Sequence, residues 1–387
     1  MEDQYFTNNP PPEGLRSHLT LARAFIDEHA SQGRRVVLVT SGGTTVPLET
    51  QTVRFIDNFS AGTRGATSAE YFLDAGYAVI FLHRQFSLLP YSRHYSHNTR
   101  SFLDFVREDE GGRVVVDEEH QTDMARVLRQ YTKAKQRNML LILSFVTITD
   151  YLWELREVAK LMRPLGHRGL FYLAAAVSDF FVPADRMVEH KIQSGEEFQE
   201  QQREQQRQRQ QQQQQSNGGG GKAATALPPP PPRPPAARTE GRSLIIDLEP
   251  VPKFLKTLVD GWAPESVIVS FKLETEPSLL VRKARHSLDK YQHHLVIGNL
   301  LSTRKWEVVF VTPDGERWVR VPRNRRTKSV SGIEALVGQA AGSATAELED
   351  GMLLEEPLGE PAVEIESLII PAVSEMHEQV IARSEKL

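Results

Sequence analysis

The feature that most constrains the fold is a pair of uninterrupted apolar runs with a helical pattern between them. Residues 36–39 form the first run, residues 77–82 form the second, and residues 66–73 have the apolar spacing of a helix. Runs that are apolar on both faces are typical of strands in parallel sheets that helices cover. This segment therefore predicts a strand–helix–strand unit within an α/β fold.

The same alternation continues along the chain. Strands are expected at 139–145, 169–175, 244–248, 266–271 and 294–298, and helices at 121–136, 151–162, 252–258, 277–291 and 365–386. Residues 306–312 and 317–321 flank a Pro-Asp-Gly turn at 313–315, which indicates a hairpin. We predict a Rossmann-like, three-layer α/β/α fold with a mostly parallel sheet and a C-terminal β-hairpin.

A stretch of different composition interrupts this pattern. Residues 195–242 contain glutamine, glycine and proline tracts, which bury little apolar surface. We expect a disordered insertion there, inside a single domain made of residues 35–194 and 243–387; residues 1–34 would be an N-terminal segment and helix. Expansion of a surface loop is the favoured interpretation, because added loop length costs little entropy. Recruitment of an SH3- or WW-type partner is the alternative.

Composition excludes several classes of protein. None of the 387 residues is cysteine, which rules out disulfides, thiolate metal sites and a cysteine nucleophile. The net charge of -4 implies no general attraction to nucleic acid. No apolar run approaches the roughly 20 residues needed to cross a bilayer, and the first residues do not form a signal peptide. We expect a cytoplasmic protein that uses neither a membrane nor a nucleic acid as partner.

Two glycine-containing turns lie between the first strand and the helix of the first unit. Ser41-Gly42-Gly43 follows the first strand, and Ser60-Ala61-Gly62-Thr63-Arg64-Gly65 opens the helix. Unpaired backbone N–H groups at a helix N-terminus bind phosphate well when glycine lets the ligand approach. The dinucleotide fingerprint G-x-G-x-x-G and the loop G-x-x-x-x-G-K-[ST] are both absent. A phosphate site is one interpretation of these glycines, and ordinary turn chemistry is the other.

Small and polar residues also follow later strands, at 174–180, at 271–275 and at Asn299. Ligands of such sheets bind outside the carboxyl ends of the strands. Asp179 could accept a hydrogen bond from a hydroxyl or hold a metal, and Lys191 offers a positive charge for a phosphate. Taken singly, each is an ordinary surface charge, but their joint position at strand ends favours a binding site.

Several longer motifs resemble one known family. They are Ser41 to Thr44 with Val46 to Glu49, Val53 to Ala66, Ala174 to Phe180, His190 to Ser194, Ser270 to Thr275, and Asn299. Over residues 34–312 they follow the order found in phosphopantothenate–cysteine ligases. The Phe-Lys-Leu-Glu-Thr motif at 271–275 resembles the eukaryotic, ATP-using type. Bacterial forms commonly carry a flavin-dependent decarboxylase domain and prefer CTP. Because the first strand is expected at residue 36, we expect no such domain here.

The resemblance implies a step of coenzyme A biosynthesis. The carboxylate of 4′-phosphopantothenate would attack the α-phosphate of ATP, giving an acyl-adenylate and pyrophosphate. The amine of L-cysteine would then form the amide, 4′-phosphopantothenoylcysteine, and release AMP. Members of the family use Mg²⁺, and we expect a homodimer; the resemblance does not identify the metal ligands.

The resemblance also assigns roles to individual residues. Positions that match the family's nucleotide site are Gly42, Ser60, Gly62, Gly65, Phe271 and Asn299. Positions that match the phosphopantothenate site are Arg54, Asn58, Ala175, Ala176 and Asp179, with Arg54 expected to reach the substrate of the partner subunit. For catalysis we expect Asn58 to act as a hydrogen-bond donor and Lys191 as a charge stabiliser.

Two other functions are weighed against the ligase. An NAD(P)-dependent oxidoreductase of Rossmann-like fold is the runner-up, although the fingerprint and an acidic residue after the second strand are missing. A scaffold that uses the glutamine and proline tracts is third. For Asn58 the alternative is a turn residue, the usual role of Asn beside Ser and Gly.

Overall fold

The computed structural model describes residues 2–96, 101–192, 235–240, 243–322 and 361–386. Within these ranges the strands of the main sheet lie in the order β16-β15-β14-β13-β8-β1-β4-β7. The parallel strands are β1 (Val36–Ser41), β4 (Ala78–Arg84), β7 (Leu140–Phe145), β8 (Gly169–Leu173), β13 (Val267–Glu274) and β14 (Leu295–Leu300). The antiparallel strands β15 (Glu307–Thr312) and β16 (Gly315–Arg320) form the hairpin at the edge. The predicted mostly parallel sheet with a C-terminal hairpin is confirmed.

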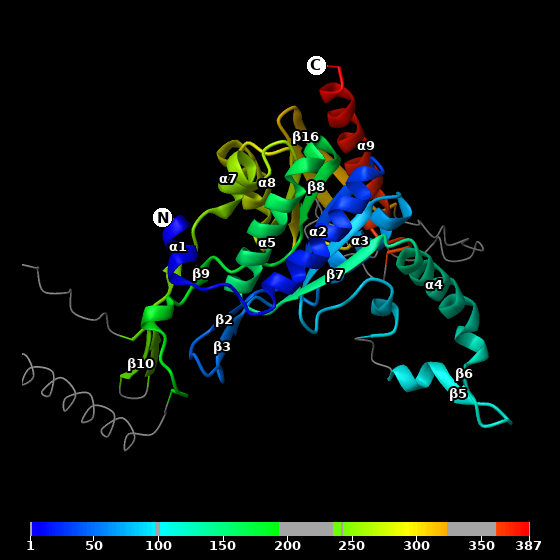
Figure 1. The fold of residues 1–387 in the computed structure, drawn as a ribbon, viewed down its shortest axis with the longest axis horizontal. Helices are drawn as coiled ribbons and strands as arrows, with labels where there is room; N and C mark the ends of the chain where they lie inside the picture. Colours follow the sequence, from blue (N-terminus) through cyan, green and yellow to red (C-terminus); the bar gives the residue numbers. More distant parts are fainter. Residues whose placement is uncertain (1, 97–100, 193–234, 241–242, 323–360, 387) are drawn as a thin grey trace, which may run out of the picture.

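Helices cover both faces of this sheet (Figure 1). On one side lie α2 (Leu15–Ser31), α5 (Ile148–Met162) and α8 (Pro277–Tyr291), and on the other α3 (Thr63–Asp74), α4 (Glu118–Gln136) and α9 (Glu366–Ser384). The side chains of β1 alternate between the two cores, as strand geometry requires. Val36 and Leu38 belong to the core under α2 and α5, and Val37 and Val39 to the core under α3 and α9. The three-layer prediction is confirmed.

The order of the strands defines a crevice beside β1. After β1 the chain adds β4 and then β7 on one side, and it returns to add β8, β13 and β14 on the other. The connections that leave β1 and β8 therefore diverge, although Val36 of β1 is paired with Gly169 of β8. A point where the strand order reverses is where α/β sheets bind ligands, outside the carboxyl ends of the strands.

Smaller elements surround the main sheet. They are α1 (Glu2–Asn8), α7 (Phe254–Thr257), and the antiparallel pairs β2 (Thr45–Pro47) with β3 (Phe55–Asp57), β5 (Val106–Glu108) with β6 (Val114–Val116), β9 (Phe180–Phe181) with β12 (Glu249–Pro250), and β10 (Ala237–Glu240) with β11 (Ser243–Ile246). The strand expected at 244–248 is β11, which pairs with β10 and lies outside the main sheet.

Most of the expected insertion at 195–242 lies outside the described residues, so the division of the chain into 1–34, 35–194 with 243–387, and the insertion stays a prediction. Strands from both sides of that stretch nevertheless belong to one sheet. In the described part of the chain, no helix is long and apolar enough to cross a membrane.

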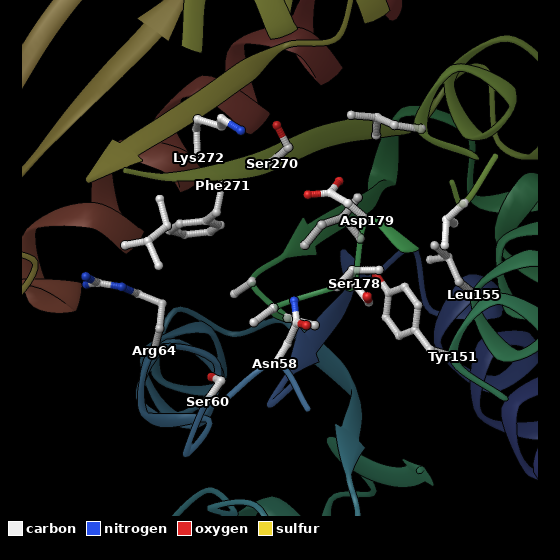
Figure 2. Close-up of a pocket in the computed structure, with 18 of the residues that line it drawn as sticks. Asn58, Ser60, Arg64, Tyr151, Leu155, Ser178, Asp179, Ser270, Phe271 and Lys272 are labelled. Carbon is white, nitrogen blue, oxygen red and sulfur yellow. The ribbon is translucent and has the colours of Figure 1, made fainter. Parts of the chain in front are cut away.

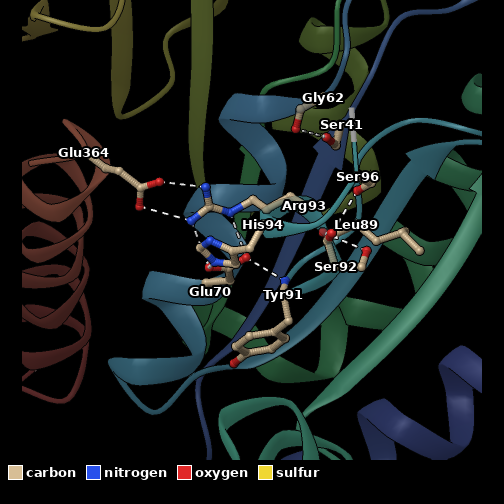
Figure 3. A network of polar contacts seen from close by, with 10 residues as sticks. All are labelled: Ser41, Gly62, Glu70, Leu89, Tyr91, Ser92, Arg93, His94, Ser96 and Glu364. Carbon is tan, nitrogen blue, oxygen red and sulfur yellow. Dashed lines mark hydrogen bonds and ion pairs between the residues drawn. The ribbon is translucent and has the colours of Figure 1, made fainter. Parts of the chain in front are cut away.

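Ion pairs attach the C-terminal helix to the core (Figure 3). The Arg93 guanidinium lies between the carboxylates of Glu70 on α3 and Glu364 just before α9, at 2.8 and 2.6 Å. Arg64 of α3 also pairs with Glu366 at 2.8 Å. These contacts fix α9 against α3, and α3 begins at the crevice beside β1.

Candidate active site

A pocket of about 930 Å³ occupies the crevice at the carboxyl ends of β1, β8, β13 and β14 (Figure 2). Its wall includes eight of the residues that the sequence singled out: Asn58, Ser60, Gly62, Ala175, Ala176, Asp179, Phe271 and Asn299. Residues that are more than 200 positions apart in the chain thus meet at one site. Gly42, Gly65, Arg54 and Lys191 are not among the lining residues.

Backbone hydrogen bonds join the loops that leave β1 and β8. The Ala176 amide donates to the Gly42 carbonyl at 2.8 Å, and the Thr44 amide donates to the Ala176 carbonyl at 3.1 Å. The Ser178 amide donates to the Thr44 hydroxyl at 2.9 Å. Thr44 is fully buried. Sequence analysis quoted it only within a motif, because nothing in the pattern marks a threonine whose partner lies 134 residues away. These bonds hold the Ala175 and Ala176 segment at the floor of the pocket.

The glycine turn before α3 leaves a helix N-terminus facing the pocket. Gly62 is the N-cap residue with φ +84°, a conformation that favours glycine, and no side chain caps the helix. The Ser41 hydroxyl donates to the Gly62 carbonyl at 3.0 Å, which fixes the turn against the end of β1. Because Gly62, Thr63 and Arg64 line the pocket, the free N–H groups of the first turn are available to an anion.

Gly42 and Gly65 shape this region from behind the pocket wall. A Cβ on Gly65 would lie 2.5 Å from the Ser41 Cβ, and one on Gly42 would lie 2.8 Å from the Arg84 Cβ. Gly43, which was not proposed as a site residue, has no room for a Cβ because that atom would overlap the Asn58 carbonyl. These glycines permit the close approach of chain segments, and a direct contact with a ligand stays a prediction for Gly42 and Gly65.

Asn58 and Asp179 project into the pocket from its two joined loops (Figure 2). The backbone N–H of Asn58 donates to the backbone carbonyl of Thr44 at 3.2 Å. The backbone carbonyl of Asp179 accepts from the backbone N–H of Val251 at 2.9 Å. With their backbones held in this way, the side-chain amide and carboxylate remain available to a ligand. Asp179 is the one carboxylate among the residues described as lining the pocket.

Four cationic side chains line the pocket as well: Arg64, Lys253, Lys272 and Arg304. Arg64 pairs with Glu366 and also donates to the Arg304 carbonyl at 2.6 Å. The Lys272 amine lies 3.4 Å from Glu274. The charges suit an anionic ligand. Sequence analysis had quoted Arg64 and Lys272 only as parts of motifs, and it had not marked Lys253 or Arg304.

Aromatic and neutral polar groups complete the wall. Phe271 packs edge-on against Tyr172, with ring centroids 5.0 Å apart, and so presents a fixed apolar face. Burial raises the pKa of Tyr151 to about 12, against the effect of its hydrogen bond with Thr40.

The Ser270 hydroxyl lies 2.7 Å from His293 Nε2, and burial, with a contribution from His294, lowers the pKa of His293 to about 4. This imidazole is therefore neutral at pH 7.

Arg54 and Lys191 lie together outside the pocket. Arg54, in the turn between β2 and β3, places its guanidinium 3.1 Å from the buried Glu49 carboxylate. The same carboxylate accepts a hydrogen bond from the Ile192 amide at 3.2 Å, next to Lys191. Sequence analysis had quoted Glu49 only as part of a motif, and its buried position reveals a link between the two expected residues.

A metal site built by the protein alone is not found among the described residues, which hold no cluster of three or more His, Asp or Glu side chains suited to one. Mg²⁺ is usually bound by one or two carboxylates together with substrate phosphates and water. The exposed Asp179 carboxylate beside a cationic pocket fits that kind of binding.

Comparison with known proteins identifies the family. A family model described as "DNA/pantothenate metabolism flavoprotein C-terminal domain" matches residues 32–155. Phosphopantothenate–cysteine ligase CAB2 of Saccharomyces cerevisiae is 46% identical over 325 residues, which cover 83% of this chain and 80% of that protein. The chain belongs to the phosphopantothenate–cysteine ligase family.

Two further comparisons agree with this family. The human phosphopantothenate–cysteine ligase is 38% identical over 346 residues, covering 88% of this chain and 96% of that protein. A solved structure of a Cab2 mutant in complex with phosphopantothenate-cysteine has a TM-score of 0.75 and 40% sequence identity, and covers 99% of both chains. The resemblance inferred from the motifs is thus confirmed. As a phosphopantothenate–cysteine ligase family member, the chain is an enzyme of the class that forms C–N bonds.

Proposed function

We propose that this chain joins 4′-phosphopantothenate to L-cysteine, using ATP and passing through an acyl-adenylate, with AMP and pyrophosphate as the other products. The observation that carries the proposal is a single pocket with two differently equipped ends. Ser60 and Arg64, at the start of α3, lie toward one end, Ser178 and Asp179, in the loop after β8, lie toward the other, and Asn58 lies between them (Figure 2). The names of the relatives support the substrates, and the solved Cab2 complex supports the product.

The nucleotide would bind at the α3 end. The free N–H groups around Gly62 and the Ser60 hydroxyl suit its phosphates, and Arg64 and Arg304 add positive charge. The fixed ring of Phe271 suits a base, and Asn299 suits a sugar hydroxyl. We propose ATP as the nucleotide because the residues at 271–275 match the ATP-using type.

Phosphopantothenate would bind at the β8 end. The small side chains of Ala175 and Ala176 let it approach the backbone, and Asp179 and Asn58 provide an acceptor and a donor for its hydroxyl and amide groups. Its carboxylate would then point toward the nucleotide end, because both ends open into one pocket.

The reaction would proceed in two steps, adenylation of the carboxylate and formation of the amide. An oxygen of the pantothenate carboxylate bonds to the α-phosphorus as the bond to pyrophosphate breaks. The cysteine nitrogen then bonds to the acyl carbon, AMP leaves with the electron pair of the acyl–oxygen bond, and the proton of the amine passes to solvent. Asn58 would donate a hydrogen bond to the carbonyl oxygen, and Lys191 would stabilise the negative charge. Alignment of two anions accounts for much of the acceleration, so no protein nucleophile is needed.

A magnesium ion would be held mainly by the phosphates and would neutralise part of their charge; one oxygen of the Asp179 carboxylate would bind it while the other accepts from the substrate. Asp179 is the one carboxylate among the described residues that line the pocket, which is why it is chosen for this role.

We also propose a cytoplasmic homodimer in which Arg54 serves the partner's substrate. Next to Arg54, the apolar side chains of Val53 and Phe55 are 56% and 50% exposed, and Phe59 at the pocket wall is 93% exposed, as expected for a surface that another subunit covers. Arg54 itself lies outside the pocket of its own chain, which agrees with service to a second pocket.

The test is direct turnover by the purified protein. Phosphopantothenate, cysteine and Mg²⁺ are supplied with ATP or with CTP, and pyrophosphate release and product mass are followed. The proposal expects pyrophosphate with ATP, and the acyl-adenylate when cysteine is omitted. Faster turnover with CTP would overturn the nucleotide assignment, and absence of product with either nucleotide would overturn the function. Oxidation or reduction of NAD(P)H by the same protein would favour the oxidoreductase alternative.

A further inference from the structure

We propose that Glu49 is a positioning residue, whose buried carboxylate holds Arg54 and the Lys191 segment in one fixed arrangement. This inference rests on the proposed function, because Arg54 and Lys191 derive their roles from it. The contacts of Glu49 themselves do not depend on that assignment.

The carboxylate of Glu49 accepts four hydrogen bonds from two separate segments. Its Oε2 accepts from the Val53 amide at 3.1 Å and the Arg54 amide at 2.7 Å. Its Oε1 accepts from the Arg54 guanidinium at 3.1 Å and from the Ile192 amide at 3.2 Å. One oxygen thus fixes the turn that carries Arg54, and the other joins the Arg54 side chain to the residue after Lys191.

The backbone around Glu49 extends the same contact. The Thr50 amide donates to the Val188 carbonyl at 2.8 Å, and the Gln51 amide donates to the Glu189 carbonyl at 3.0 Å. Residues 188–192 therefore run beside residues 49–51, and the side chain of Glu49 is the contact at the Ile192 end. The main-chain bonds hold the segment at Val188 and Glu189, and the Glu49 carboxylate adds a contact at Ile192.

The chemistry of the site requires a charged carboxylate. Glu49 is 0% exposed; burial opposes its ionisation, but the donors from Arg54, Ile192 and Val53 together lower its pKa. A glutamine of the same size has only one acceptor oxygen, and its NH₂ group would face two donors. We expect the one remaining acceptor to stay with the Val53 and Arg54 amides, which include the shortest of the four bonds, so Glu49→Gln loses the contact that joins the Arg54 side chain to Ile192.

Glu70 provides a matched control. It is another nearly buried carboxylate, and it accepts from the Tyr91 amide at 2.6 Å and from the Arg93 guanidinium at 2.8 Å (Figure 3). It lies on α3 and takes no part in the proposed chemistry. Glu70→Gln removes the same charge and similar hydrogen bonds at a different place.

The first measurement is hydrogen exchange of residues 188–192 in the protein without ligands. We expect Glu49→Gln to speed exchange of the Ile192 amide by about tenfold or more, as loss of a charge-assisted hydrogen bond implies, and Glu70→Gln to leave it unchanged. Unchanged exchange in Glu49→Gln, or an equal increase in both variants, would overturn the proposal. This measurement does not depend on the activity of the protein.

The second measurement is the kinetics of ligation. We expect Glu49→Gln to raise KM for phosphopantothenate by about tenfold and to lower kcat, with KM for ATP unchanged, because Arg54 and Lys191 both lose their positions. In the double variant Glu49→Gln with Arg54→Ala, the effects on KM should be less than additive. Additive effects, or a KM that does not move while Ile192 exchanges faster, would overturn the positioning role.

The proposal can still be tested if the variant does not fold or if the wild-type protein shows no turnover. If Glu49→Gln does not fold, Glu49→Asp keeps the charge with a shorter reach, and the same two measurements apply to it. If the wild-type protein shows no turnover, the proposed function fails, whereas hydrogen exchange still decides whether Glu49 holds the segment.

Discussion

The backbone amide of Ala176 lies within 2.8 Å of the Gly42 carbonyl, so the loops that leave β1 and β8 are bonded directly to each other. Thr44 extends this connection, since its hydroxyl accepts from Ser178 and its carbonyl accepts from Asn58. The geometry of the site thus depends on contacts between residues that are far apart in the chain and are brought together by the order of the strands.

The first prediction concerns this connection. Thr44→Val keeps the shape of the side chain but leaves the buried Ser178 amide without an acceptor, so we expect a loss of about 1–3 kcal/mol in the free energy of unfolding. Denaturant unfolding monitored by circular dichroism measures it. Thr20→Val on the exposed face of α2 is the control and should change stability by less than about 0.5 kcal/mol. Equal stabilities of the two variants would contradict the prediction.

The second prediction concerns Asn58. Asn58→Asp replaces a donor with a negative charge in a pocket that is expected to hold two anions, so kcat should fall by about 100-fold or more. The fold should remain intact, because the backbone bond to Thr44 does not involve the side chain. Pyrophosphate release and thermal unfolding measure the two effects. Turnover near that of the wild type would show that Asn58 is only a turn residue.

The third prediction concerns Lys191. Lys191→Ala should lower kcat by about 10- to 100-fold and leave KM for ATP nearly unchanged, because the charge is expected to act on the transition state. Lys191→Arg, which keeps the charge with a different shape, should retain more activity. A rise in KM alone, with kcat preserved, would assign Lys191 to ground-state binding.

The fourth prediction tests the shared site. Arg54→Ala should weaken phosphopantothenate binding, and Asn58→Asp should remove catalysis. If each pocket takes Arg54 from the partner, random mixing of the two variants leaves about a quarter of the pockets intact, because half of the dimers are mixed and each has one complete site. Coexpression followed by turnover assays measures this recovery. Failure of the mixture to exceed the parent variants would rule out a site shared between subunits.

The fifth prediction concerns pH. Burial lowers the pKa of His377 to about 4, against the effect of its hydrogen bond to the His167 carbonyl; its Nδ1 accepts from the Tyr77 hydroxyl at 2.9 Å. The unfolded chain therefore binds a proton at this residue between pH 6.5 and about 4, whereas the folded chain does not. Stability should fall by a few kcal/mol as the pH is lowered through this range, on the basis of about 1.4 kcal/mol per pKa unit. Denaturant melts at several pH values measure it, and His377→Gln should flatten the pH dependence.

The fold could be predicted largely from local patterns. The apolar run of β1 indicates burial on both faces, and its four residues from Val36 to Val39 are fully buried. The turn at 313–315 indicates the hairpin of β15 and β16. By contrast, the run at 244–248 looks like a strand of the main sheet but belongs to the separate β10–β11 pair, because local composition does not determine which neighbour a strand selects.

The site could be predicted where residues follow strands, and less well where contacts between segments decide the geometry. Asp179 and Asn299 line the pocket as strand ends suggest, and Asn58 lines it as the family resemblance implies. Thr44 and Glu49 could not be assigned roles from the sequence. Their roles depend on hydrogen bonds with Ser178 and Ile192, which are more than 130 residues away. The direct roles of Gly42, Gly65, Arg54 and Lys191 stay predictions, because these residues do not line the pocket of the single chain.

The pairing of β8 with β13 has a practical consequence. Leu170 of β8 is paired with Val267 of β13, and the chain between these strands contains the stretch from 193 to 234. A peptide break within that stretch would yield two pieces, each with an open apolar strand edge that matches the other. The pocket walls would then be divided between them, so expressing the two pieces together offers a split enzyme whose activity reports their reassembly.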